Sequence, residues 1–271
     1  KIKLEIMKGK INQNLKNTLD HLLSHNSNVA YKISKSNNFS PYEKIAKLQY
    51  SYENIKSLLK LNIDKSKIRI YYHHSSLRDI SYDLFVESKN LMENSKTHKN
   101  KNKIPLFWIK ESIRNNNKAI NLINKIYDKN LSDKNFKLCG HEYNQITKSY
   151  SNLASIRDNN FDKIKDIETL IDYKIELGKF VQNHFNLTQN NRTINFHYYE
   201  AGDYAFKLYK DYHQENHRKK ALMLYQQYIK KQKTKSGING KMKRFKTRGL
   251  KKNKKYNIVK YRIEHLVHRT I

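Results

Sequence analysis

The sequence predicts an α+β protein that is mostly helical. A long helical N-terminal region, residues 1–200, is expected to precede a small basic C-terminal region, residues 201–271, with a loop and one or more β-strands. Three observations support this: apolar residues recur at helical spacing over most of the chain, short segments alternate as strands do, and positive charge is concentrated near the C-terminus. A polar tract near residues 94–103 is expected to be a linker.

The first predicted helix begins after Ser40. Ser40 is a favourable N-cap, Pro41 suits the first turn, and Glu43 completes a capping box with Ser40. Apolar residues then follow at alternating spacings of three and four: Ile45, Leu48, Tyr52, Ile55 and Leu59. This stripe predicts a helix of about five turns.

Three later segments repeat the helical spacing. One stripe comprises Ile113, Ile120, Ile123 and Tyr127. A second comprises Ile164, Ile167, Ile171 and Ile175, and Gly178 is expected to end that helix. A third runs from Ala201 to about Lys231 through Ala205, Leu208, Tyr212, Leu222, Tyr225 and Ile229. Each stripe predicts one helix with a single buried face.

Strand patterns are sparser. Residues 67–72, KIRIYY, alternate briefly, and residues 257–267, NIVKYRIEHLV, alternate for longer. The two faces of the second segment differ only partly. One of them is therefore expected to pair with another strand or to contact RNA.

The charge balance is extreme and asymmetric. The chain has 55 Lys and Arg against 24 Asp and Glu, a net charge of +31. Residues 218–271 hold 19 Lys or Arg and one acid, Glu264, so 18 of the 31 net charges lie in this last fifth of the chain. Self-repulsion on this scale opposes a compact free state, and a bound polyanion would relieve it. Only 37% of the residues are hydrophobic, which predicts a thin core.

The composition indicates an AT-rich gene. Lys, Asn and Tyr number 45, 33 and 20, whereas Ala, Gly and Pro number 7, 7 and 2. The abundant types use codons rich in A and T, as in an organelle or a parasite. Glutamate codons are also A-rich, but Glu is not enriched to match, so codon bias alone does not explain the net charge. The chain begins with Lys1, which suggests a processed start or one piece of a longer protein.

Several classes of site are not expected. Cys139 is the only cysteine, which excludes an internal disulfide and a multi-cysteine metal site. The twelve histidines form no His-Glu-x-x-His motif, so neither a metal nor another cofactor is expected. The acids form no paired catalytic motif, and those at 162–172 are expected to balance lysines and a helix N-terminus. No apolar run approaches the roughly 18 residues of a membrane span.

Residues 235–255, KSGINGKMKRFKTRGLKKNKK, hold ten Lys or Arg, no acid and three of the seven glycines. Only two residues separate Gly237 from Gly240, and Met242 follows the lysine, so this is not a nucleotide-binding loop. The glycine pair also resembles the clamp of KH domains, but no apolar helix follows it. A surface membrane helix would need a coherent apolar face, which is missing. A disordered lysine tail remains an alternative.

The favoured interpretation is a phosphate-binding region. The residues expected to bind RNA are Arg218, Lys219, Lys220, Lys235, Lys241, Lys243, Arg244, Lys246, Arg248, Lys251, Lys252, Lys254 and Lys255. The glycines expected to allow close backbone approach are Gly237, Gly240 and Gly249. Such contacts position a protein on RNA without reading its sequence. Tyrosines could add base stacking.

Three segments resemble the carboxy-terminal half of small-subunit ribosomal protein three, in a divergent, organellar form. HRKKALMLYQQYIKK (217–231) resembles its basic helix, SGINGKMKR (236–244) its loop, and YRIEH (261–265) its following strand. The loop is one residue short and lacks the family's Arg, His265 stands where Tyr is usual, and KKQKTK replaces the preceding strand. The family's KH domain is not found in residues 1–200. The resemblance implies a place on the head of the small subunit, near the messenger entry channel.

The sequence thus predicts a non-enzymatic structural constituent of an organellar ribosome, in the mitochondrial matrix, with rRNA and neighbouring ribosomal proteins as partners. No catalytic residue and no small-molecule substrate are expected. An intron maturase or homing endonuclease, a large-subunit ribosomal protein, and a peripheral membrane or assembly subunit are the alternatives.

Overall fold

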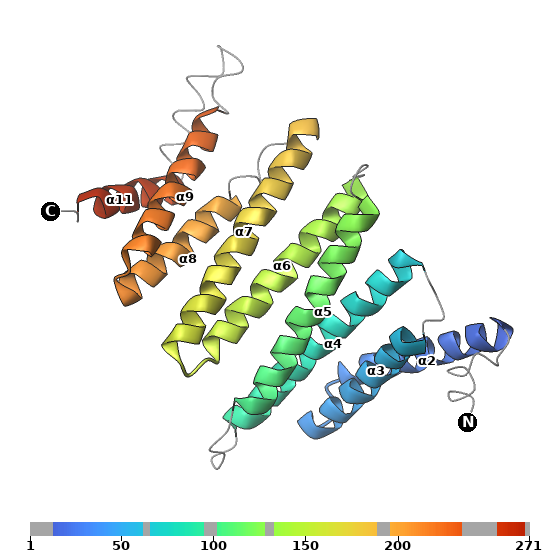
Figure 1. The fold of residues 1–271 in the computed structure, drawn as a ribbon. Helices are drawn as coiled ribbons and strands as arrows, with labels where there is room; N and C mark the ends of the chain where they lie inside the picture. Colours follow the sequence, from blue (N-terminus) through green and yellow to red (C-terminus); the bar gives the residue numbers. More distant parts are fainter. Residues whose placement is uncertain are drawn as a thin grey trace. The chain divides into compact units, whose positions relative to one another are not determined.

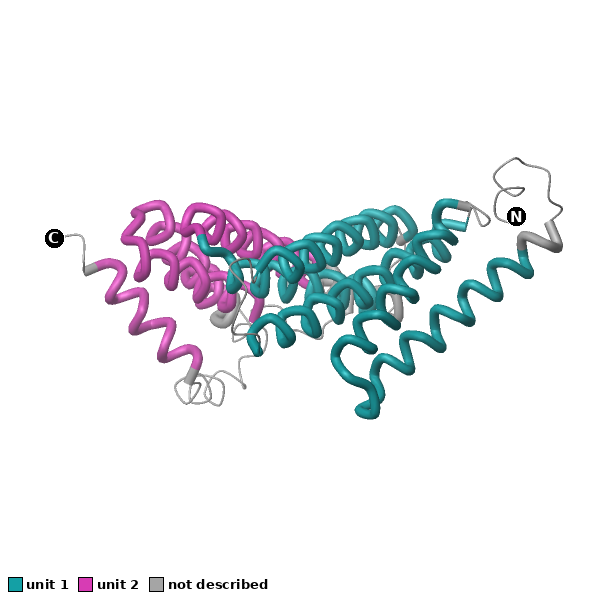
Figure 2. Tube along the Cα trace, turned by 90° about the horizontal axis from the view of Figure 1, so that it is seen from below, with its two compact units in different colours: residues 1–158 teal, residues 159–271 magenta. Residues whose placement is uncertain are grey.

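A computed structural model describes residues 13–61, 66–94, 102–127, 133–188, 196–234 and 254–268 (Figure 1). Every regular element in these ranges is an α-helix, and these ranges contain no β-strand. The chain forms two compact units, Lys1–Asp158 (unit 1) and Asn159–Ile271 (unit 2), shown in Figure 2. The division lies at Asp158–Asn159, whereas the sequence suggested a division at residue 200.

Unit 1 is a series of helices in chain order: α2 (Gln13–Ser34), α3 (Pro41–Leu61), α4 (Lys67–Glu93), α5 (Lys103–Tyr127) and α6 (Asp133–Ser155). Each helix packs against the next one, and successive helices run in opposite directions (Figure 1). Each helix therefore buries its apolar stripe against its neighbours in sequence, as in helical repeat architectures.

The predicted start of α3 is confirmed. The Ser40 amide donates to Glu43 Oε2 at 2.8 Å, and the Glu43 amide donates to Ser40 Oγ at 3.3 Å, which together make the capping box. The apolar stripe that follows is buried at Leu48, Tyr52 and Ile55. Ile113, Ile120 and Ile123 of the stripe predicted for residues 113–127 are likewise buried in α5.

The core of unit 1 is partly polar. The Oγ atoms of Ser27 on α2 and Ser51 on α3 lie 2.7 Å apart and are buried, so a hydroxyl pair joins these helices. On α4, the Tyr71 hydroxyl donates to Glu142 of α6 at 2.9 Å. In a chain with few apolar residues, such hydrogen-bonded polar pairs take the place of some contacts that apolar side chains would make in the core.

Unit 2 contains α7 (Asn160–Thr188), α8 (Phe196–Tyr212), α9 (Glu215–Thr234) and α11 (Lys254–His268). Helix α7 packs on α8, α8 on α9, and α9 on α11. The fully enclosed side chains include Leu170, Ile171, Leu177, Leu208, Leu224 and Tyr225. Helix α9 ends at Thr234 and α11 begins at Lys254, so most of the basic segment 235–255 lies between these two helices in the sequence.

Two expected helix boundaries were wrong. Helix α7 continues through Gly178, where an added Cβ would lie 2.9 Å from Tyr198 Cε2. This glycine allows α8 to approach closely and does not end the helix. The helix expected from Ala201 to about Lys231 is broken at His213, which has a φ of 54° and donates its amide to the Tyr209 carbonyl at 2.7 Å. Histidine here adopts the left-handed conformation more often taken by glycine, so no residue-type signal marked the end.

The predicted α+β class was also wrong. Residues 67–72 form the first turns of α4, whose buried positions recur at spacings of three and four over 27 residues. Residues 257–267 lie in α11, where Val259 and Leu266 are buried seven positions apart. Tyr261, which the alternation placed with Val259, is 69% exposed. A helical stripe can contain a few alternating positions by chance, and the longer period decides the structure.

The polar tract at 94–103 lies between α4 and α5. The Asn94 amide donates to the Asn90 carbonyl at 3.2 Å and ends α4, and α5 begins at Lys103. Residues 95–101 lie outside the described residues. The apolar segment 104–109 that follows is part of the first two turns of α5, where Trp108 and Ile109 are buried.

Candidate nucleic-acid interface

The three predicted contacts on α9 have different surroundings. Arg218 is largely buried, Lys220 is half-buried and Lys219 is exposed. They are consecutive residues near the helix start, so they point in different directions from the axis. The structure therefore separates residues that the sequence had grouped.

Arg218 links the start of α9 to the end of α11. Its Nε donates to Glu215 Oε2 at 2.7 Å, and its Nη2 donates to Glu215 Oε1 at 2.7 Å. Its Nη1 donates to the carbonyl of Leu266, in the last turn of α11. Carbonyls in a last helical turn have no partner within the helix, so a guanidinium there caps α11. The hydrogen bonds that Arg218 donates to Glu215 raise the pKa of its guanidinium.

Lys220 is held by α7. Its Nζ donates to Asp172 Oδ1 at 2.8 Å, across the α7–α9 side of unit 2. The acids near residues 162–172 thus include partners for α9, because Glu168 also contacts His217 Nε2 at 2.8 Å. Lys219 projects from the same turn with an exposed side chain.

Most of the predicted basic cluster lies outside the described residues: Lys235, Lys241, Lys243, Arg244, Lys246, Arg248, Lys251, Lys252, Gly237, Gly240 and Gly249. Lys254 and Lys255 begin α11. The Lys255 ammonium lies 3.9 Å from the ring centroid of Phe196 and 5.3 Å from that of Tyr199. This cation–π contact ties the end of the cluster to α8.

Helix α11 is fixed to α8 and α9 by a second polar group. The Tyr225 hydroxyl donates to Asp203 Oδ1 at 2.7 Å, and Arg262 donates to the Tyr225 hydroxyl at 2.8 Å and to the same carboxylate. Burial and the neighbouring Asp203 raise the pKa of Tyr225, which keeps its hydroxyl protonated as a donor. Sequence reasoning assigned no role to Arg262 or Asp203.

Charge in unit 2 is divided along the chain. Residues 159–217 carry 7 Lys or Arg and 9 Asp or Glu, a net charge of −2, whereas residues 218–271 carry 19 and 1, a net charge of +18. Acids of the first part hold Arg218, Lys220 and Arg262 of the second. These three cations stabilise the packing of α9 and α11 within unit 2. The segment 235–255 contains ten further Lys or Arg residues and no acid.

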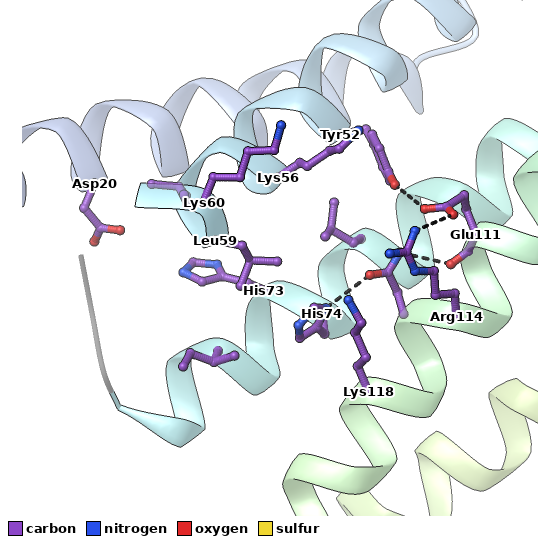
Figure 3. Close-up of a pocket in the computed structure, with 14 residues that line it drawn as sticks. Asp20, Tyr52, Lys56, Leu59, Lys60, His73, His74, Glu111, Arg114 and Lys118 are labelled. Carbon is purple, nitrogen blue, oxygen red and sulfur yellow. Dashed lines mark hydrogen bonds and ion pairs between the residues drawn. The ribbon is translucent and has the colours of Figure 1, made fainter. Parts of the chain in front are cut away.

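Unit 1 contains a cleft that sequence reasoning missed (Figure 3). It has a volume of about 400 Å³ and opens between α3, α4 and α5, with Asp20 of α2 at one end. Its charged and titratable lining residues are Asp20, Lys56, Lys60, His73, His74, Glu111, Arg114 and Lys118. They come from four helices between residues 20 and 118, so no local motif connected them.

The buried histidine of this cleft is held in one tautomer. The side-chain nitrogen of Asn115 donates to the Glu111 carbonyl at 2.9 Å, so the Asn115 oxygen, 3.1 Å from His74 Nδ1, accepts a hydrogen bond from the Nδ1–H of the imidazole. Burial lowers the pKa of His74, and the charges of Lys118, His73 and Arg114 lower it further, whereas the hydrogen bond that His74 donates to Asn115 raises it. A field of positive charge therefore surrounds this ring.

Other kinds of site are not found in the described part of the chain. It holds no group of three or more His, Cys, Asp or Glu side chains placed to bind a metal ion. None of its helices is long and apolar enough to cross a membrane. Cys139 is buried in α6, and burial raises the pKa of its thiol to about 11, so it is a packing residue.

No family model and no curated protein matches the sequence. Among solved structures, the chain is similar to a de novo designed helical repeat protein, with a TM-score of 0.50 and 7% identity over 82% of this chain and 97% of that chain. It is also similar to a structure described as the computational design of self-assembling cyclic protein homooligomers, with a TM-score of 0.36, 12% identity, and coverage of 99% and 92%. The first likeness shows the fold alone, a helical repeat-like arrangement.

Proposed function

We propose that this protein is a non-enzymatic RNA-binding protein, a structural constituent of the small subunit of a mitochondrial ribosome. Its basic C-terminal region contacts rRNA, and its helices pack against neighbouring ribosomal proteins. One observation carries the proposal: residues 218–271 have a net charge of +18, next to a helical frame in the same unit whose net charge is −2. Phosphate backbones are the densest common partners for such a charge.

The contacts in unit 2 support this division of roles. Three cations of the C-terminal region form ion pairs with Asp172, Glu215 and Asp203, and these ion pairs help to hold α9 and α11 in place. The remaining cluster, 235–255, is tethered at both ends to helices that pack against each other. A tethered segment loses less conformational entropy on binding RNA than a free tail would.

Two further observations support the ribosomal setting. The AT-rich composition is typical of an organellar gene. The segment 217–231, which resembles a basic helix of small-subunit ribosomal protein three, forms most of α9. The segment 261–265 is helical, however, where that family has a strand, and the loop segment 236–244 lies outside the described residues.

The first test is sedimentation of native organelle lysate at low and high salt, with detection of this chain. We expect it to migrate with small subunits and to remain there at high salt. Migration with the large subunit would keep the ribosomal role and reject the subunit assignment. Release at modest salt, or migration with membranes, would contradict the proposal.

The second test uses the purified full chain and a structured RNA in a filter-binding assay. A variant with Lys241, Lys243, Arg244, Lys246 and Arg248 changed to Gln is compared with a matched variant. The matched variant carries five exposed lysines of unit 1 changed to Gln: Lys32, Lys47, Lys103, Lys110 and Lys137. If the cluster makes five single-strand contacts, its variant loses about 3.5 from the slope of log K against log salt. Equal losses in both variants would contradict a specific role for the cluster.

A further inference from the structure

The cleft of unit 1 combines paired cations from two facing helices. Lys56 and Lys60 are four residues apart on α3, and Arg114 and Lys118 are four residues apart on α5. Residues at this spacing share a helix face, and like charges there repel. Figure 3 shows the two lysines of α3 across the cleft from the two cations of α5, with His73 of α4 beside Leu59.

The carboxylates at the cleft do not balance these charges. Asp20, with its side chain 4% exposed, is paired with Arg69. Glu111 accepts the Tyr52 hydroxyl at 2.7 Å and Arg114 at 3.2 Å, and Lys56 is paired with Glu53 at 3.3 Å. The cleft residues and their ion-pair partners thus include five cations and three acids, with His73 and His74 counted as neutral. The cations are Lys56, Lys60, Arg69, Arg114 and Lys118, and the acids are Asp20, Glu53 and Glu111. Lys60 and Lys118, on opposite sides, have exposed side chains.

The floor of the cleft is apolar. Leu58 and Leu77 are buried beneath it, and Leu59 and Ile70 line it with half-buried side chains. A volume of about 400 Å³ lies within the range of small-molecule sites and has room for one nucleotide. The cations of the cleft can bind a phosphate, and its apolar side chains can pack against the sugar or base attached to that phosphate.

We propose that this cleft is a second RNA contact, in which Lys60 and Lys118 hold a phosphodiester of an unpaired nucleotide. This inference rests on the proposed function, because it takes RNA to be the polyanion. An unpaired segment fits better than a duplex, since the cleft is recessed between helices and a duplex presents its phosphates on a wide convex surface. The contact uses unit 1 and is independent of the C-terminal cluster.

The test compares two double variants of the full chain. Lys60→Gln with Lys118→Gln changes the cleft, and Lys47→Gln with Lys110→Gln changes two other exposed lysines, on the same two helices but outside the cleft. At 0.1 M salt, each lost single-strand phosphate contact lowers affinity about fivefold, so we expect a loss of about twenty-five-fold in the cleft variant for an oligouridylate. The control variant should lose less than threefold.

Crosslinking locates the contact directly. RNA that contains 4-thiouridine is irradiated with the wild-type chain, and crosslinked peptides are identified by mass spectrometry. We expect crosslinks in the peptides of α3, α4 and α5 around residues 52–60, 70–77 and 111–118, lost in the cleft variant and kept in the control. The fluorescence of Trp108 under urea titration should be the same in both variants, which excludes unfolding as the cause.

The outcomes separate this inference from the function on which it rests. If the wild-type chain binds no RNA, the proposed function fails. If it binds RNA and the two double variants are equal, with no crosslinks in unit 1, only the cleft inference fails. If inorganic phosphate or ATP removes the unit 1 crosslinks at micromolar concentration, the cleft binds a small phosphate ligand and the RNA assignment is overturned.

Discussion

Arg78 of α4 and Glu142 of α6 form an ion pair inside unit 1, with side chains 2% and 0% exposed. Glu142 also accepts the hydroxyls of Tyr71 at 2.9 Å and Ser75 at 3.3 Å. Several donors on α4 therefore converge on one carboxylate of a helix that is not its neighbour in sequence. A buried pair of this kind depends on both partners, since either alone would be an uncompensated charge.

Changing Arg78 to Met is expected to lower the free energy of unfolding of unit 1 by about 3–5 kcal/mol, because Glu142 would lose its counter-charge. Trp108 is the only tryptophan, and it packs in unit 1 with its ring centroid 5.3 Å from that of Tyr52. Its fluorescence during urea titration therefore reports on this unit. The double variant Arg78→Met, Glu142→Leu should recover most of the loss. A loss below about 1 kcal/mol in the single variant would show that the pair is dispensable.

The stability of unit 1 should fall between pH 7.5 and pH 5.5. Burial, and then the charges of Lys118, His73 and Arg114, lower the pKa of His74 in the folded state. As the pH drops below about 6.5, the unfolded chain takes up a proton on this residue and the folded chain does not, so stability decreases. The slope from this one proton is at most about 1.4 kcal/mol per pH unit.

Urea titrations followed by Trp108 fluorescence at several pH values measure this effect. His74→Gln should flatten the dependence, and His141→Gln, a change on α6 outside the cleft, should leave it in place. An unchanged slope in the His74 variant would mean that other groups cause it.

Gly202→Ala is expected to destabilise unit 2 by about 1–3 kcal/mol, through overpacking. An added Cβ would lie 2.7 Å from Cδ1 and Cε1 of Tyr225, whose ring cannot move away easily because its hydroxyl is bonded to Asp203 and Arg262. Hydrogen exchange of α8 and α9 measures the loss. Gly140→Ala is the control: nothing lies within 4 Å of its Cβ, so the higher helix propensity of Ala should stabilise α6 by up to about 1 kcal/mol. Equal effects at the two glycines would contradict the steric argument.

The sequence predicted some local features of the fold correctly. The capping box at Ser40 and the stripe after it depend on residues within a few turns, and the structure confirms both. The strands were wrong because alternation over six to eleven residues competes with a helical period that only longer windows resolve. Helix ends were wrong where tertiary contacts decide them: Gly178 gives room to Tyr198, and His213 takes the left-handed turn.

The candidate sites were less predictable for a physical reason. Charge density marks residues 235–255 without any knowledge of the fold. The cleft of unit 1 depends on helices brought together by packing. Its only local signals are two pairs of like charges at i and i+4, Lys56 with Lys60 and Arg114 with Lys118. The different roles of Arg218 and Lys219 could not be predicted without the position of α11, because the carbonyl that Arg218 caps is 48 residues away in the chain.

Arg218 and Lys219 are adjacent and both basic, but they should respond differently to substitution. Arg218→Ala removes the contacts to Glu215 and to the Leu266 carbonyl, so α11 should detach from the start of α9. Lys219→Ala leaves these contacts in place and removes one exposed cation. Hydrogen exchange of residues 254–268 should therefore accelerate in the Arg218 variant alone.

RNA filter binding completes the comparison. Lys219→Ala should lower affinity about fivefold at 0.1 M salt, the value of one phosphate contact, with no change in the exchange of α11. Arg218→Lys, which keeps the charge but not the forked donor geometry, should resemble Arg218→Ala in the exchange experiment, because a lysine cannot bond Glu215 and the Leu266 carbonyl together. If Arg218→Lys instead kept α11 protected, charge alone would hold this helix, and Arg218 would not act as a cap.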